Sequence, residues 1–392
     1  MQAKNEEISK ESKRIAIEKL STELSFDYNN LVKEKIKTIE DLEEYIINKF
    51  SKIPNRCNDI TILIQNFKSE ESRESFQIII QKLLAMSFST NFAKLKGSKE
   101  IVSLKWGLRV KKVLIYNNNF FSVPLYNNLI NLIENFNKAH ALLFDNNLFE
   151  GAFSDLILAL NFCKGLRTLS LWNSVFLSKQ AKDFESLSLK KITSLYLFDS
   201  TFRMSDFTYI LSLPSFNKLN YINISNNILT TEFIKYKNEI ENFVDTILSK
   251  NLRILKLAKC YVPQYFLVNL FDKLCNNNKL IELDLFEIRI QSVFNGIGEN
   301  NAIFKAFKKF IANNNNIAAL NLIYQYLWIN IHKNNLTNIL FSKPNLAFVS
   351  LLRNGINLNE KVVERFLKGK MLYDLMHYIL PFNEIKKNTQ IP

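Results

Sequence analysis

The sequence predicts an α/β solenoid, in which a short strand and a helix recur along the chain and the strands form one parallel inner sheet. An apolar pattern returns at intervals of mostly 26 to 29 residues, which leaves room for a strand and a helix in each repeat. The chain has 392 residues and 47% hydrophobic content, but only 8 Gly and 7 Pro. Sandwich and barrel folds need more turn residues than this. Each repeat is therefore expected to bury its apolar face against the next one.

The repeated pattern has the form L-x-x-L-x-L-x-x-N. Its clearest copy is Leu166–Phe176, LRTLSLWNSVF, with Ser174 in the ninth position. Two intervals, of 33 and 37 residues, are longer than the rest. Recurrence at this regularity is not expected by chance, and it predicts eleven copies. Their first apolar residues are Cys57, Leu83, Val110, Ala139, Leu166, Ile192, Leu219, Leu252, Leu280, Ile317 and Leu346.

This pattern resembles the ribonuclease-inhibitor-like class of leucine-rich repeats over residues 57–357. The resemblance implies a horseshoe with a parallel sheet inside and helices outside. It also implies that an Asn in the ninth position binds backbone groups in the loop after the strand. Asn91, Asn118, Asn147, Asn227 and Asn354 occupy that position. Ser174, Ser200 and Cys260 can replace it in part, whereas Gln65, Gln325 and Ile288 depart from the pattern.

Helices are predicted between the strands and at both ends. Residues 125–136 and 266–275 carry apolar residues at helical spacing. Residues 1–56 are expected to be an N-terminal helical cap or docking segment, with Thr38 and Asp41 as a capping pair. Residues 57–357 are expected to form the repeats, with Asn295–Asn301 as a loop insertion. Residues 358–392 are expected to be a C-terminal helical cap and tail.

Charge and cysteine content bear on partners and compartment. The formal net charge is +14, and the excess lies after residue 56, because residues 1–56 hold 11 basic and 11 acidic residues. A basic balance can serve nucleic acid or acidic partners. The basic residues are scattered along the chain, which favours a solvated surface over a nucleic-acid site. Four cysteines without metal-ligand spacing indicate reduced thiols in a cytoplasmic protein. The start does not resemble a secretory signal. The sequence contains no run of about 18 apolar residues, so no membrane span is expected.

Candidate partner-binding residues follow from strand geometry. In each copy the fourth and sixth side chains enter the core, so the third, fifth and seventh face the concave side. Large aromatics at these positions predict a binding surface for a protein or peptide. The alternative is that the rings stack on one another and shield the sheet. The predicted residues are Tyr116, Trp172, Tyr196, Phe198 and Tyr221.

The sequence predicts no catalytic residue, metal site or cofactor. Glu282 and Asp284 could be a carboxylate pair like that of a glycosidase. Lys256 and Lys259 in the preceding repeat instead favour a cross-strand ladder of opposite charges. The three histidines fall in different repeats, and the chain lacks the Gly-rich phosphate-binding motifs.

These features predict a non-enzymatic protein-binding scaffold. One alternative is a ubiquitin-ligase-type adaptor that docks through residues 1–56, although the Leu-Pro start of an F-box is missing. Such a chain could be a microbial effector that acts in a host cytosol. Another alternative is a GTPase-activating protein, since the eleven repeats resemble those of the Ran GTPase activator. That family carries an acidic tail, whereas this chain ends in NEIKKNTQIP.

Overall fold

The computed structural model describes most of the repeat region, and its contacts divide the chain into two compact units. The first unit comprises Met1–Phe202 and Tyr209–Leu219, and the second comprises Arg203–Thr208 and Asn220–Pro392. The described residues are 21–36, 38–51, 59–88, 110–116, 118, 123–200, 202–229, 236–277, 279–291, 297–322, 340, 343 and 345–350.

The first unit contributes neighbouring parallel strands in the order β1-β2-β3-β4-β6-β8. These strands are β1 (Ser21–Asp27), β2 (Asp59–Gln65), β3 (Val110–Tyr116), β4 (Ala141–Asp145), β6 (Thr168–Ser170) and β8 (Ser194–Tyr196). A second parallel pair joins β5 (Leu148–Ala152) to β7 (Val175–Ser178). The helices are α2 (Tyr28–Lys33), α3 (Ile39–Ser51), α4 (Glu70–Phe88), α5 (Val123–Glu134) and α6 (Phe153–Leu160), with 3₁₀ turns η2 (Ala181–Ser186) and η3 (Pro214–Phe216).

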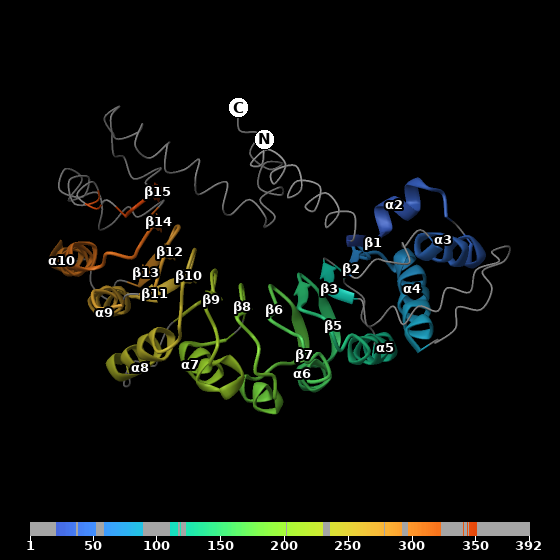
Figure 1. Ribbon diagram of the computed structural model, residues 1–392, viewed down its shortest axis with the longest axis horizontal. Helices are drawn as coiled ribbons and strands as arrows, with labels where there is room; N and C mark the ends of the chain where they lie inside the picture. The colour runs from blue at the N-terminus through green and yellow to red at the C-terminus, as the bar shows by residue number, and fades with distance from the viewer. Residues whose placement is uncertain are drawn as a thin grey trace, which may run out of the picture. The chain divides into compact units, whose positions relative to one another are not determined.

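The second unit repeats the same arrangement, with the parallel order β9-β10-β12-β14-β15. Its strands are β9 (Tyr221–Asn223), β10 (Ile254–Lys256), β12 (Glu282–Asp284), β14 (Ala319–Asn321) and β15 (Phe348–Ser350). A parallel pair joins β11 (Tyr261–Pro263) to β13 (Arg289–Gln291). The helices are α8 (Tyr236–Leu248), α9 (Gln264–Leu274) and α10 (Ile297–Asn313), and α7 (Met204–Ser212) has residues in both units. In each unit the helices pack on one side of the strands (Figure 1).

The core of each repeat is built as the apolar pattern predicts. The fourth and sixth residues, such as Leu169 and Leu171, are fully buried between strand and helix. In the first unit, phenylalanine rings continue this core from repeat to repeat. Phe149 stacks on Phe176 with ring centroids 4.7 Å apart, and Phe153 contacts Phe176 at 4.9 Å and Phe184 at 5.1 Å. Burying one such ring contributes about 2–3 kcal/mol, so stacking of successive repeats is the main source of stability.

The ninth position forms the hydrogen-bonded ladder that the pattern predicts. Asn118 Nδ2 donates to the Ile64 carbonyl at 3.3 Å, and Asn147 Nδ2 donates to the Ile115 carbonyl at 2.7 Å. The shorter Ser174 and Cys260 also reach back one repeat, at 2.6 Å and 3.1 Å. Asn91, Asn354 and Gln325 lie outside the described residues. The bonds tie adjacent strands together where each strand ends, which is the behaviour of a leucine-rich repeat.

The structure corrects the N-terminal part of the predicted repeat set. Residues 83–88 were expected to begin a strand, but they end helix α4. Residues 21–27 were expected to be helical, but they form β1, because Leu24 and Phe26 alternate with polar residues and enter the core. The copy assigned to Cys57 is shifted by two residues, since Ile62 pairs with Val113. The ninth residue of that repeat is therefore Phe67 and not Gln65.

Two other predictions for this region have different outcomes. Thr38 and Asp41 do form a capping pair, because each side chain accepts from the other's backbone N–H, at 3.1 and 3.3 Å. The expected loop at Asn295–Asn301 is wrong from Ile297 onward, where α10 begins. The proposed C-terminal cap at residues 358–392 lies outside the described residues.

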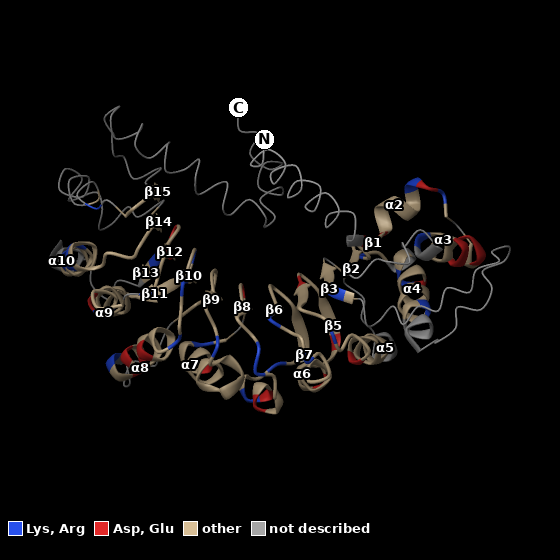
Figure 2. Cartoon of the chain, in the orientation of Figure 1, with Lys and Arg blue, Asp and Glu red and all other residues tan. Residues whose placement is uncertain are grey.

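Lys and Arg occur in several segments that connect helices to strands (Figure 2).

Candidate protein-binding face

The exposed side of the first unit's sheet carries a pair of aromatic rings in contact. Trp172 follows β6 and Phe198 follows β8, and both occupy the seventh position of their repeats. The ring centroids are 4.8 Å apart with an interplanar angle of 61°, an edge-on packing that aromatic pairs prefer. Trp172 nevertheless remains 39% exposed. Mutual stacking therefore covers only part of the indole.

Asp145 and Ser170 fix the backbone beside this pair. Ser170 Oγ donates to Asp145 Oδ1 at 2.5 Å, and the backbone N–H of Trp172 also donates to the Asp145 carboxylate. Burial raises the pKa of Asp145 above its ordinary value, and these two hydrogen bonds oppose that rise. The carboxylate thus holds the chain of β4 against that of β6, and Trp172 is presented from a rigid support.

Leucines extend the apolar surface across the neighbouring strands. Leu63, Leu114 and Leu143, on β2, β3 and β4, occupy the fifth position of their repeats, and the strand register places them side by side. All three are half-buried. The sequence analysis did not identify Leu63, although a two-residue shift of the repeat leaves this side chain on the same, exposed face. The signal was available in the alternation Ile62, Leu63, Ile64, which suits a strand covered on one side only.

The structure brings four of the five predicted aromatics into one unit. Tyr196 faces Ser170 across the β6–β8 pair, and Tyr116 faces Asp145 across the β3–β4 pair. Tyr116 is therefore separated from Trp172 by the intervening strand β4. Tyr221 belongs to the second unit, where the Lys256 ammonium lies 5.9 Å from its ring centroid. We define the aromatic face as Tyr116, Trp172, Tyr196 and Phe198.

The corresponding face of the second unit carries charges that pair with one another. Lys256 Nζ lies 3.2 Å from Glu282 Oε1, and the Glu282 side chain is almost fully buried. Burial raises the pKa of Asp284, against the effect of the Phe286 N–H and of Lys256. These contacts are the predicted cross-strand ladder, although Lys256 pairs with Glu282 more closely than with its register partner Asp284.

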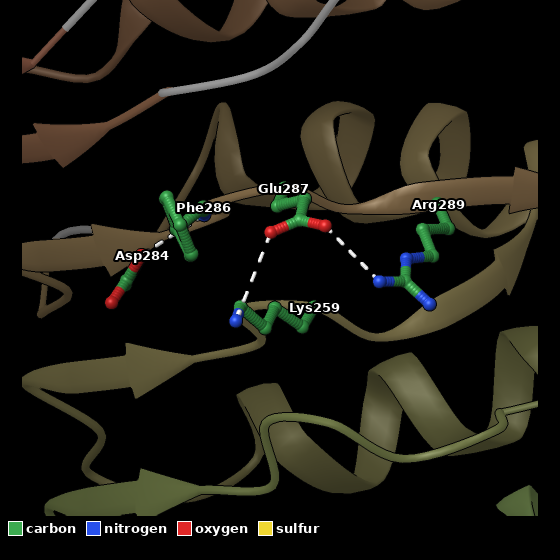
Figure 3. A network of polar contacts seen from close by, with 5 residues as sticks. All are labelled: Lys259, Asp284, Phe286, Glu287 and Arg289. Atoms are coloured by element: carbon green, nitrogen blue, oxygen red, sulfur yellow. Dashed lines mark hydrogen bonds and ion pairs between the residues drawn. The ribbon is translucent and has the colours of Figure 1, made fainter. Parts of the chain in front are cut away.

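A second charged group lies beside this ladder, just after the strands. Glu287 is held by Lys259 at 3.8 Å and by Arg289 at 3.0 Å (Figure 3). Phe286 lies next to the pair, with the Lys259 ammonium 5.5 Å from its ring centroid. The charged side chains named on this face therefore already form ion pairs with one another.

The thiols in the described part of the chain lie in the core. Cys163, Cys260 and Cys275 are free and buried. Burial raises the pKa of Cys163 and of Cys260 to about 12, so both thiols are protonated at neutral pH. A nucleophilic or metal-binding thiolate needs the opposite environment. No group of three or more His, Cys, Asp and Glu side chains in the described ranges is arranged to hold a metal ion.

Comparison with known proteins gives a remote structural likeness. A solved internalin of Listeria monocytogenes is similar to this chain, with 14% sequence identity and a TM-score of 0.36. The match covers 77% of this chain and 94% of the internalin. No protein-family model and no curated protein sequence matches the chain.

A helix that crosses a membrane must be both long and strongly apolar. Within the part of the chain that the structure describes, no helix meets both requirements.

Proposed function

We propose that the chain is a protein-binding scaffold whose aromatic face holds a protein or peptide partner. The supporting observation is the exposed Trp172 packed against Phe198 and continued by half-buried Tyr196 and leucines. Trp and Tyr are the side chains that most often supply binding energy at protein interfaces. A large apolar surface beside polar residues is also costly to leave in water. This reading places the partner on the concave side expected for the ribonuclease-inhibitor-like class.

The test compares two double variants that each truncate two apolar side chains reached by solvent. Trp172→Ala/Phe198→Ala changes the aromatic face, and Leu158→Ala/Phe162→Ala changes one residue on α6 and one just after it, each 51% exposed. Proteins captured from a lysate of the source cells are quantified by mass spectrometry, after circular dichroism shows that each variant is folded. We expect a partner that the wild type and the α6 variant retain and that the face variant loses by about thirtyfold or more.

Equal capture by all three proteins would overturn the proposed site. Equal loss from both variants would also overturn it, because binding would then follow apolar surface in general and not this face.

One observation favours a second role, in which the N-terminal helices dock another protein. Val32 on α2 and Ile39 and Ile47 on α3 are 58%, 45% and 38% exposed. An adaptor would use such residues to bind its machinery. Deleting residues 1–50 is a poor test, because it removes β1 and exposes the edge of β2. Replacing these three residues with Ser keeps the strand, and a docking role predicts loss of one partner while partners of the aromatic face are retained.

A further inference from the structure

A row of cations lies where the strands of the first unit begin. Four segments without Asp or Glu lie at or just before the starts of β3, β4, β6 and β8: 110–112, 137–140, 163–168 and 187–194. Together they carry seven Lys and Arg residues. We call this set the basic edge: Lys111, Lys112, Lys138, Lys164, Arg167, Lys190 and Lys191.

Backbone hydrogen bonds hold these segments side by side. The His140 N–H donates to the Lys111 carbonyl at 2.7 Å, and the Arg167 N–H donates to the His140 carbonyl at 2.8 Å. The Thr193 N–H donates to the Arg167 carbonyl, also at 2.8 Å. These segments pack closely at Gly165 and leave little room for a side chain. A Cβ at this position would lie 3.2 Å from both the His140 ring and the Lys138 carbonyl. Neighbouring strands are about 4.8 Å apart, so four of them place the seven cations within roughly 15 Å along the edge.

The cations of the basic edge are available to a partner. Six of the seven side chains are exposed, and Lys111 is half-buried. None of the ion pairs found within the described ranges includes any of the seven. Like charges held this close repel one another, and an anion that covers them relieves the repulsion. Because the seven residues occur one or two at a time in the sequence, the row exists only in the folded chain.

The second unit has no comparable row at the described entries to β10 and β12. Lys250 is buried, with only 6% of its surface exposed. Lys279 Nζ donates to Asn251 Oδ1 at 2.6 Å, and Arg253 is exposed. The density of unpaired cations is therefore a property of the first unit's edge and not of the repeat itself.

We propose that the basic edge binds an acidic segment of a protein, the same partner whose apolar residues cover the aromatic face. This choice of occupant rests on the proposed function. Arg167 and Lys191 precede β6 and β8, and Trp172 and Phe198 follow them. Each cation is five to seven residues before its ring, about 17–23 Å of extended chain, which one extended peptide of a few residues can span.

A nucleic acid suits the edge less well. Proteins that bind single strands combine cations with aromatic rings on which the bases stack. One exposed ring, Phe162, directly precedes the segment 163–168, and the four segments themselves contain no Phe, Tyr or Trp. A single ring does not make the series of rings on which successive bases stack.

The experiment measures binding of a short fluorescein-labelled polyglutamate peptide by fluorescence anisotropy at about 0.15 M ionic strength, where distant charges are largely screened. Lys164→Glu/Arg167→Glu reverses two charges of the basic edge. Lys305→Glu/Lys308→Glu reverses two exposed charges on α10 and changes the net charge equally. We expect the edge variant to bind at least about tenfold more weakly and the α10 variant to bind within about twofold of wild type. Circular dichroism checks that both variants are folded.

Three results would overturn the inference: no binding by the wild type, equal loss in both variants, or tighter binding of oligouridine with the same dependence on Lys164 and Arg167. Trp172→Ala/Phe198→Ala should leave polyglutamate binding unchanged. If polyglutamate does not bind at the basic edge, but partner capture still depends on Trp172 and Phe198, only this inference is wrong. If polyglutamate binds at the basic edge, but partner capture does not depend on those two residues, the proposed function is wrong instead.

Discussion

The two units build the same backbone from different residues, and the eighth position of the repeat shows this most clearly. In the first unit it is held by Asn146, Asn173 and Asp199, with φ of 57°, 44° and 51°. In the second unit Asn226 has φ of 57° as well, but Lys259 and Glu287 take the next two eighth positions, with φ of 57° and 49°. Asn and Asp tolerate this left-handed conformation, whereas longer side chains adopt it at a cost. The turn is therefore fixed by the repeat and not by the local preference of its residue.

The exposed strand faces of the two units also differ in their residues. The first unit presents aromatic and leucine side chains that cover one another only in part. The second unit presents Lys256, Glu282, Lys259 and Glu287, which satisfy one another. A face whose groups are already paired has less to gain from a partner. Because the fold is common to both units, the partly uncovered side chains are what favour the first unit's face as the proposed binding surface.

The largest effect is expected at the ninth position of the first unit. Asn147 Oδ1 accepts from the backbone and the side chain of Asn118, and Asn147 Nδ2 donates to two carbonyls. Asn147→Ala leaves these buried groups without partners, so we expect a loss of about 3 kcal/mol in the free energy of unfolding. Urea unfolding followed by circular dichroism measures it.

Two controls sharpen this comparison between units. Asn147→Ser should recover part of the loss, because Ser174 makes the equivalent bond to the Phe144 carbonyl in the next repeat. Cys260→Ala in the second unit removes a single weak sulfur bond and should cost about 1 kcal/mol. Equal costs for Asn147→Ala and Cys260→Ala would show that the ladder contributes no more in the first unit than in the second.

The sequence could predict most of the repeats because their buried positions are almost purely apolar. Ten of the eleven predicted copies contain a strand. The copy at Leu83 was wrong because Leu83, Met86 and Phe88 also suit a helix, and α4 includes all three. The strand β1 was missed because its core residues, Leu24 and Phe26, are only two and lie among charged residues. Short apolar patterns cannot distinguish strand from helix without the neighbours that they pack against.

The candidate site could be predicted in part, from the alternation of side chains along each strand. That rule placed Trp172, Tyr196 and Phe198 on the exposed face. The basic edge could not be recognised in the same way, because its cations are one or two per repeat and look scattered in the sequence. They gather only when the repeats stack, which brings residues about 27 positions apart to neighbouring strands.

A smaller effect is expected from breaking the ion pair on the second unit's face. Lys256→Met leaves the buried Glu282 carboxylate without its cation, and we expect a loss of about 1–2 kcal/mol at pH 7, less than for a fully buried pair because Lys256 is partly exposed. Lys237→Met, at an exposed pair with Glu241, should cost less than about 0.5 kcal/mol. Equal costs would contradict the view that this face depends on its own pairing.

The same variant makes a prediction about pH. Burial raises the pKa of Asp284, and Lys256 acts against this rise, so Lys256→Met should raise the pKa further. A carboxyl with a raised pKa binds its proton more tightly in the folded state. The stability that this proton binding contributes is fully present below the pKa that the carboxyl has in the unfolded chain. It is lost as the pH rises through the pKa that the carboxyl has in the folded chain. The deficit of Lys256→Met should therefore shrink as the pH falls from 7 toward 4, as measured by urea unfolding at each pH. A deficit that grew on acidification would contradict this assignment.

The smallest effect tests the eighth position directly. Lys259→Asn places the first unit's residue in the second unit's turn, where the backbone N–H still donates to the Phe286 carbonyl. Relief of the left-handed strain should contribute about 1 kcal/mol, and loss of the exposed pair with Glu287 should remove a few tenths. We expect a net stabilisation of about 0.5 kcal/mol, because Arg289 continues to hold Glu287.

The reverse exchange completes the test. Asn173→Lys introduces the strain into the first unit and removes the Asn173–Asn146 side-chain bond, so it should cost about 1–2 kcal/mol. Both variants are compared with wild type by urea unfolding. A loss of stability in Lys259→Asn would mean that the charge network around Glu287 outweighs the strain. The second unit would then keep Lys259 for its pairing, and the difference between the two turns would follow from the difference between the two faces.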